Sequence, residues 1–482
     1  MTVDRGRVRS ADSIHVPFVT ASLLFGIFGG FTLAVTLPLE VLLGSPDRSW
    51  VAHAQVHGHL QAVGFAGLFV LGMGLRLAPR FGSGRLAFPG LVRPGFALLA
   101  AGLLLRAIGQ PLAGHVFFSA LLASGAFAEL TGATIFAAIF AATLAPAVRK
   151  AEPNALLLLA AVSWFLVQAA FGAWWLLDLA LDGGIVLPAT EDQALVNLQV
   201  FGMVLSAILG VGMRVFPTFF GMPAPRRGPS LVIAVLVTGG LIVWTMGTLL
   251  PSGNAGEGLT SLGTMAVGIA ILGAVATFGF GRLRHRMAEA SRGYIWALQP
   301  VLFWMALTGV GLLAAGARGL LSGEVPSAAG LDALRHVFTV GVVTLAIVTM
   351  AQLILPEFAS ERITQRPAAW RGAAFGGVLS VAALLRGGLP WADRIHGDDH
   401  YRAMAAAGLL ALFAVAAFGL LYWRARRRHR VFTRRAAAMR ARSEPVAVVQ
   451  SAPPMTTDEK ENRHGESFVP PNTQSRGRAS AD

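Results

Sequence analysis

The chain has 482 residues, of which 55% are hydrophobic and only 13% are charged. Soluble globular proteins carry about 25% charged residues, so this composition excludes a soluble enzyme, a disordered chain and a disulfide scaffold. Cysteine is absent, which also excludes thiolate metal sites, iron–sulfur clusters and cysteine nucleophiles. The formal net charge of +14 lies in the loops and in the C-terminal segment, and it does not indicate a nucleic-acid partner.

Apolar runs that are long enough to cross a bilayer, at about 20 residues each, follow one another along most of the chain. They predict an all-α polytopic membrane protein. The first run follows a short polar segment, residues 1–15, and is too long for the apolar core of a cleaved signal peptide, so we expect it to be retained. The twelve predicted spans are 16–43, 54–78, 94–110, 116–146, 154–180, 195–215, 229–250, 260–281, 296–321, 331–355, 372–389 and 402–423.

The loops between these spans alternate in charge. One set is basic, as in Arg80, Arg85 and Arg93, and the other is acidic or neutral, as in Glu191 and Asp192. The positive-inside rule therefore predicts that both termini lie in the cytoplasm, and an even number of spans requires the same parity.

Two segments with different properties follow the last predicted span. Residues 424–442 are rich in arginine and predict a juxtamembrane anchor for lipid phosphates rather than a nucleic-acid site. Residues 443–482 are polar and without periodicity, which is typical of a disordered cytoplasmic tail.

The second, sixth and tenth predicted spans contain an internal repeat. Residues 59–81 and 197–219 share Leu, Gln, three Gly, Arg, Pro and Phe at an offset of 138, and a third copy begins at His336. Each period holds four spans. The sequence therefore predicts a transmembrane domain over 16–423 that is built from three quasi-equivalent four-helix units, at about 16–146, 154–281 and 296–423.

Three histidines lie close together near the predicted outer end of the second span. His53 and His57 share one helix face, whereas His59 is about 200° further round and looks the other way. Imidazole is a natural ligand of haem iron and copper. Because His59 and His336 occupy the same place in their copies, we expect them to be axial haem ligands, with His57 and His53 as alternates or as a copper site.

Other polar groups on the predicted outer side have two open interpretations. His396 and His400 flank Asp398 and Asp399, a spacing that suits a surface metal site but suits a hydrated loop better. Three arginines on that side would pair either with haem propionates or with nearby aspartates; they are Arg106, Arg335 and Arg386.

The pattern of spans and histidines resembles subunit I of the haem–copper oxidases, and it is more similar to the NnrS family of membrane proteins. The second span carries His57-Gly58-His59 followed by Gly64 and Pro79, and the tenth begins with His336 and Gly341. The middle copy ends in a similar stretch, from Gly212 to Phe219. The resemblance covers residues 16–423.

The resemblance implies a protein of the bacterial inner membrane with haem b and copper, linked to nitric oxide metabolism or nitrosative stress. Its partners would be the lipid bilayer and nitric oxide or a redox partner. Spans six and seven contain no histidine, so the copper ligands that are usual in the oxidases are missing and enzymatic activity stays open.

Two other classes of function fit the sequence. One is a haem-free transporter or copper-handling permease, since repeat-built folds are common among transporters. The other is an accessory subunit of a respiratory complex that holds no cofactor of its own.

Overall fold

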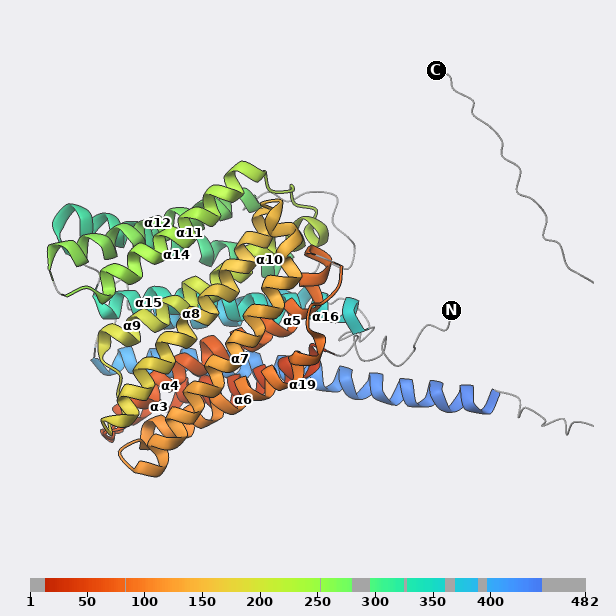
Figure 1. Ribbon diagram of the computed structural model, residues 1–482, viewed down its shortest axis with the longest axis horizontal. Helices are drawn as coiled ribbons and strands as arrows, with labels where there is room; N and C mark the ends of the chain where they lie inside the picture. Colours follow the sequence, from red (N-terminus) through yellow and green to blue (C-terminus); the bar gives the residue numbers. More distant parts are fainter. Residues whose placement is uncertain are drawn as a thin grey trace, which may run out of the picture. The chain divides into compact units, whose positions relative to one another are not determined.

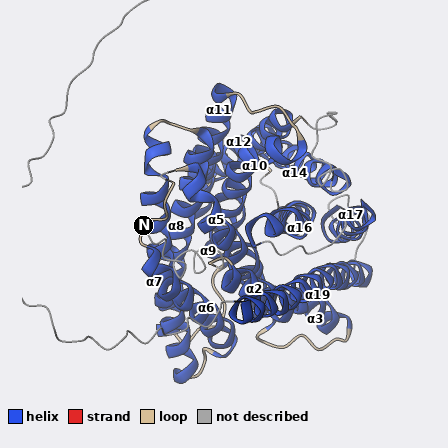
Figure 2. Cartoon of the chain, turned by 90° about the vertical axis from the view of Figure 1, so that its right-hand side faces the viewer, coloured by secondary structure: helices blue, strands red, loops and turns tan. Residues whose placement is uncertain are grey.

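The computed structural model describes residues 14–82, 84–251, 253–279, 295–324, 327–359, 369–388 and 397–443. Within these ranges Figure 2 shows helices and connecting loops only, which confirms the predicted all-α class. The predicted N-terminal segment, apart from its last two residues, and residues 444–482 of the predicted tail lie outside the described ranges.

Many of the α-helices continue directly into a π-helical turn. The label η is used for π-helical turns and for short 3₁₀ turns. In chain order the helical segments are α2 (Val16–Leu24), η1 (Phe25–Phe31), α3 (Thr32–Leu42), α4 (Trp50–His59), η2 (Leu60–Gly67), α5 (Leu68–Phe81), α6 (Val92–Gly109), α7 (Val116–Arg149), α8 (Pro153–Leu181), α9 (Ala189–Asn197), η5 (Leu198–Val204), α10 (Leu205–Phe220), α11 (Arg227–Leu249), α12 (Asn254–Phe278), α14 (Ile295–Ser322), α15 (Ala328–Phe338), η6 (Thr339–Thr344), α16 (Leu345–Ala359), α17 (Ala369–Ala383), η7 (Leu384–Gly388) and α19 (Gly397–Ser443). Two short 3₁₀ turns, η3 (Pro89–Leu91) and η4 (Gln110–Leu112), flank α6.

Eleven helices in the described part of the chain are long and apolar enough to cross a membrane. They match the first ten predicted spans and the last one. The segment predicted as the eleventh span, 372–389, is helical as α17 and η7 but is not among these eleven. Large apolar side chains point outward along the bundle, and Val116 and Leu321 are each 89% exposed. A surface of this kind suits a lipid environment.

The described residues up to Arg430 belong to one compact unit, in which the helices run side by side (Figure 1). A second unit begins at Val431, and its described part is the C-terminal portion of α19. The candidate site lies wholly within the first unit.

A π-helical turn interrupts each of the three helices that carry the repeated motif, as η2, η5 and η6. In each of them a glycine packs directly against an aromatic ring of the preceding span. A Cβ atom placed on these glycines would lie 3.1, 2.9 and 2.6 Å from the ring-bearing side chain. The pairs are Gly64 with Phe25, Gly202 with Trp164, and Gly341 with Trp304.

Two helix pairs, α6 with α7 and α11 with α12, approach closely through glycines, as small residues allow in membrane proteins. A Cβ atom on Gly102 would lie 2.8 Å from the carbonyl oxygen of Gly125. The corresponding atom on Gly240 would lie 3.2 Å from the carbonyl oxygen of Gly263. Both glycines of the second pair follow those of the first by 138 residues.

Candidate functional site

A cavity of about 400 Å³ lies among the helices of the described part of the chain. Ligand sites in proteins are concave, mostly apolar and roughly 300–1,000 Å³ in size. Its walls come from spans one, two, six and ten, from η7 and from α19. The polar groups that line it are Gln55, His57, Gln61, Asp192, Asp332, Arg335, His336, Thr339, Thr344 and Arg386.

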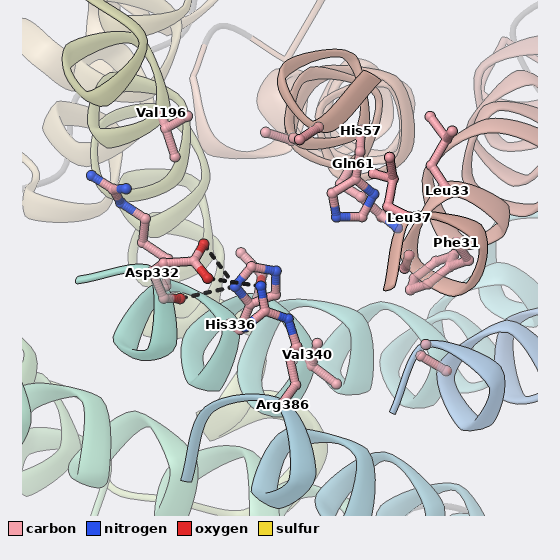
Figure 3. Close-up of a pocket in the computed structure, with 18 of the residues that line it drawn as sticks. Phe31, Leu33, Leu37, His57, Gln61, Val196, Asp332, His336, Val340 and Arg386 are labelled. Atoms are coloured by element: carbon pink, nitrogen blue, oxygen red, sulfur yellow. Dashed lines mark hydrogen bonds and ion pairs between the residues drawn. The ribbon is translucent and has the colours of Figure 1, made fainter. Parts of the chain in front are cut away.

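His57 on α4 and His336 on α15 face each other across this cavity (Figure 3). Their ring centroids are 6.4 Å apart, and the ring planes are 5° from parallel. In Figure 3 the ring of His57 extends from its helix toward the ring of His336. The structure therefore brings together His57 and His336, two of the four histidines of spans two and ten that the sequence predicted as haem or copper ligands.

The other nitrogen of each ring is fixed by the protein. His57 Nδ1 is hydrogen-bonded to the carbonyl oxygen of Gly30 at 2.8 Å. His336 Nδ1 is hydrogen-bonded to the carbonyl oxygen of Asp332 at 2.8 Å and lies 3.2 Å from a carboxylate oxygen of the same residue. A carbonyl oxygen can only accept, so Nδ1 is the donor in both rings, and a neutral imidazole in this tautomer has its lone pair on Nε2. Metal-binding histidines are held in the same way, through the nitrogen that does not bind the metal.

Basic and acidic side chains close one end of the cavity. Arg386 donates to Asp332 at 2.7 Å, as Figure 3 also shows. Arg335 donates to two neutral acceptors, the side-chain oxygens of Asn197 and Gln193, each at 2.8 Å. Both arginines line the cavity. Its charged groups therefore come from α15, which also carries His336, and from η7.

The remaining wall is apolar and mixes small with larger side chains. Small residues allow a bound group to approach the helix backbones closely. The small residues of the lining are Ala34, Ala54, Gly58, Ala62, Ala66, Ala407, Gly408 and Ala411.

His59 lies outside this cavity lining, in a separate buried cluster. Its Nε2 is 2.8 Å from a carboxylate oxygen of Glu129, and its Nδ1 is 3.1 Å from the side-chain nitrogen of Gln199. Gln199 also donates to Gln168 at 3.0 Å. These four side chains are each at most 5% exposed. Both ring nitrogens of His59 are therefore occupied within the protein, and the prediction that it is a ligand stays untested.

A hydrogen-bonded chain of polar side chains runs next to this cluster. Arg106 donates to Gln110 at 3.1 Å, and Gln110 donates to Gln55 at 2.8 Å. Gln55 lines the cavity and also donates to the carbonyl oxygen of Leu187 at 2.9 Å. The charge of Arg106 is close enough to interact with both Glu129 and Asp192.

His53 lies in the first turn of α4, and its ring contacts Ser49, the residue that precedes this helix. Its Nδ1 is 3.0 Å from the hydroxyl of Ser49, which also donates to Asp47 at 2.7 Å. That hydrogen bond holds the pKa of the Asp47 carboxyl below its usual value. Within the described ranges, no group of three or more His, Asp or Glu side chains is arranged to hold a metal ion. The predicted copper role of His53 therefore rests on the sequence alone.

The predicted surface metal pair is only partly described. His396 lies outside the described residues, and His400 lies on the first turn of α19 with its ring 5.6 Å from that of Tyr401. The structure thus leaves this prediction open.

The polar cluster contains residues that the sequence analysis did not single out, above all Glu129. The signal was present, because Glu129 is the one acidic residue in the long apolar run 116–148. Ionisable residues at membrane depth are costly and are usually functional. Gln55 and Gln110 gave no such signal, since isolated glutamines near helix ends are common.

No protein-family model matches the chain, and no curated protein matches its sequence.

Proposed function

We propose that the protein binds haem b in the cavity between His57 and His336, as a membrane protein of the NnrS type linked to nitric oxide metabolism or nitrosative stress. The observation that carries this proposal is the facing pair of imidazoles. The geometry of the site supports the haem part of the proposal. The resemblance of the sequence supports the link to nitric oxide.

The spacing of the two rings fits a metal between them. The ring centroids are 6.4 Å apart, a separation that leaves room for a metal ion between two imidazoles, since a metal–nitrogen bond is about 2 Å long. The orientation of each ring is set by a hydrogen bond at Nδ1, so neither imidazole has to turn to bind. Bound haem would supply a one-electron redox centre.

The remainder of the cavity fits the rest of a haem molecule. Its wall is mostly apolar, as a macrocycle requires, and the guanidinium groups of Arg335 and Arg386 in its lining would face the propionates. Arginine is well suited to carboxylates because its donors form a planar fork. The hydrogen bonds of Arg335 go to neutral acceptors, Asn197 and Gln193, while Asp192 and Asp332 are near enough to interact with its charge.

The contacts between helices support the predicted three-unit architecture. The π-helical turns η2 and η5 begin 138 residues apart, and η6 follows η2 by 279. The aromatic-on-glycine pairs at Gly64, Gly202 and Gly341 keep nearly the same spacing. We therefore propose three related four-helix units in an arrangement like that of haem–copper oxidase subunit I, in the bacterial inner membrane with both termini cytoplasmic.

The test is a reduced-minus-oxidised spectrum of the purified protein, expressed with ample haem and analysed for copper in parallel. We expect the bands of a six-coordinate b-type haem with two histidine ligands. Copper without haem would overturn the proposal in favour of a copper-handling permease, because imidazoles also bind copper. A protein without either cofactor that co-purifies with a respiratory complex would overturn it in favour of an accessory subunit.

A further inference from the structure

A second cavity, of about 100 Å³, lies between spans two, six and ten. These spans form the interior of the bundle, because 78%, 83% and 72% of their most apolar stretches are buried, compared with at most 56% in the other candidate spans of the described chain. The cavity walls come from α5, η5, α10, η6 and α16. The second cavity therefore lies where the three helices that carry the repeated motif meet.

The residues that line this cavity occupy equivalent positions in the three copies of the repeat. Phe69 on α5 is followed in the lining by Ala207 on α10, 138 residues later, and by Ala346 on α16, 277 residues later. The sets that begin at Val70 and at Met73 are complete in the same way. Each of the three copies therefore contributes a similar part of the wall, and no single copy could form the cavity alone.

The chemistry of the lining determines what the second cavity can hold. All of its side chains are apolar, since the lining residues are Phe, Val, Met, Leu, Ile, Ala and Gly. A buried water molecule needs two to four polar partners, and these side chains offer none. An engineered apolar cavity of about 150 Å³ stays dry and binds benzene or xenon. A cavity of about 100 Å³ with this lining suits a small uncharged molecule that forms no hydrogen bonds.

The second cavity shares part of its wall with the cavity of His57 and His336. Val204 on η5 and Val343 on η6 line both cavities. Their counterpart in the first copy, Ala66, also lines the cavity of the histidines. The shared wall is aliphatic, and these side chains carry no polar group that would hinder an apolar molecule from passing.

We propose that the second cavity binds an apolar diatomic gas, which passes between it and the cavity of His57 and His336 along Val204 and Val343. Apolar solutes favour hydrocarbon over water, so the bilayer supplies the gas to the bundle. Binding makes and breaks no covalent bond. The passage toward the histidines rests on the proposed function, whereas binding in the second cavity does not.

Xenon is the probe for the second cavity, because it is apolar, similar in size and detectable by anomalous scattering. Crystals of the full-length protein are pressurised with xenon, whatever their haem content. We expect an anomalous peak between α5, α10 and α16 in the wild type. Ala346→Leu should remove it, because the larger side chain extends from a half-buried position of the lining into the cavity. Ala101→Leu is the matched control at an exposed position of α6, and it should retain the peak.

Three results would overturn the proposal. The wild-type cavity holds no xenon, it holds ordered water or a lipid chain in place of xenon, or the peak survives in a folded variant whose cavity is filled. Val70→Phe fills the same cavity from span two, and it replaces Ala346→Leu if that variant does not fold.

The passage between the two cavities is tested with carbon monoxide bound to the reduced haem. A laser flash releases the gas, and its return is followed by absorbance. We expect a delayed fraction that returns from within the protein in the wild type and in Ala101→Leu, and its loss in Ala346→Leu. An equal delayed fraction in all three proteins, or a haem that binds no carbon monoxide, would refute the passage. A protein without haem would refute the proposed function and leave the xenon result standing.

Discussion

His57 and His59 are two residues apart on the same helix, yet they lie in opposite surroundings. His57 presents one nitrogen to a cavity of about 400 Å³ and faces a second histidine across it. His59 is buried, and both of its nitrogens contact polar side chains of other spans. The comparison shows that direction on the helix, rather than residue type or depth in the membrane, decides which histidine is available to a ligand.

The two regions also differ in how they are completed. The cluster of His59, Glu129, Gln168 and Gln199 is closed by its own hydrogen bonds, apart from one oxygen of Glu129. The cavity holds two imidazoles that are each fixed at Nδ1 and open at Nε2. The His59 cluster therefore holds the helices together, whereas the cavity is arranged to bind a ligand.

The largest expected effect is at the cavity. His57→Ala and His336→Ala should each abolish the spectrum of a haem with two histidine ligands, because each removes one of the two facing nitrogens. His53→Ala is the control, since its ring is engaged with Ser49 at the start of α4, and it should leave the spectrum unchanged. Optical and electron paramagnetic resonance spectra of the three purified variants measure the effect.

The opposite result would make His59, and not His57, the ligand opposite His336. If His57→Ala keeps the two-histidine spectrum while a folded His59→Ala loses it, the pairing of His59 with His336 from the repeat is the correct one.

His59→Leu should act on stability and not on the haem spectrum. It leaves Glu129 buried without its closest partner, and breaking a buried pair in this way costs about 3–5 kcal/mol. The measurement is the unfolding midpoint in denaturant, compared with that of His53→Leu. A variant as stable as the wild type would show that the polar cluster contributes little to the fold.

Much of the fold could be predicted because its physical signal is strong. Runs of apolar residues and the alternation of charged loops located eleven of the twelve predicted spans as long apolar helices. The segment 372–389 was harder, because it is short and glycine-rich and carries Arg386 near its end. Its helix is divided into α17 and η7.

The candidate site was only partly predictable. Helical geometry alone places His57 and His59 on opposite faces, and the structure confirms this. Which face meets His336 depends on how α4 is rotated against α15, and rotation is set by packing between distant helices. The sequence alignment matched His59 to His336 by position in the repeat, whereas the structure places the ring of His57 opposite His336.

Gly102→Ala tests how closely the helices pack against the polar cluster at Glu129. A Cβ atom there would lie 2.5 Å from Cγ of Glu129 and 2.8 Å from the carbonyl oxygen of Gly125. Overpacking of this kind costs about 1–3 kcal/mol. The matched control is Gly240→Ala, which follows 138 residues later at a similar helix contact and faces Val267 in place of the acid.

Both substitutions should lower the unfolding midpoint. The loss should be larger in Gly102→Ala, because only there does the added Cβ atom meet the side chain of a buried acid. An equal loss in Gly240→Ala would mean that the acid adds nothing to the cost of overpacking at this helix contact.

The smallest expected effect on stability is that of breaking an exposed ion pair. The pair has the same length as the buried pair of His59 and Glu129. Arg214 and Glu152 are also 2.8 Å apart, with side chains 51% and 33% exposed. Water screens such a pair, so Glu152→Gln should change the free energy of unfolding by about 1 kcal/mol or less. The effect should shrink further at high salt, which denaturation at two ionic strengths measures. A loss as large as that of His59→Leu would contradict the view that burial, and not distance, makes the difference between the two pairs.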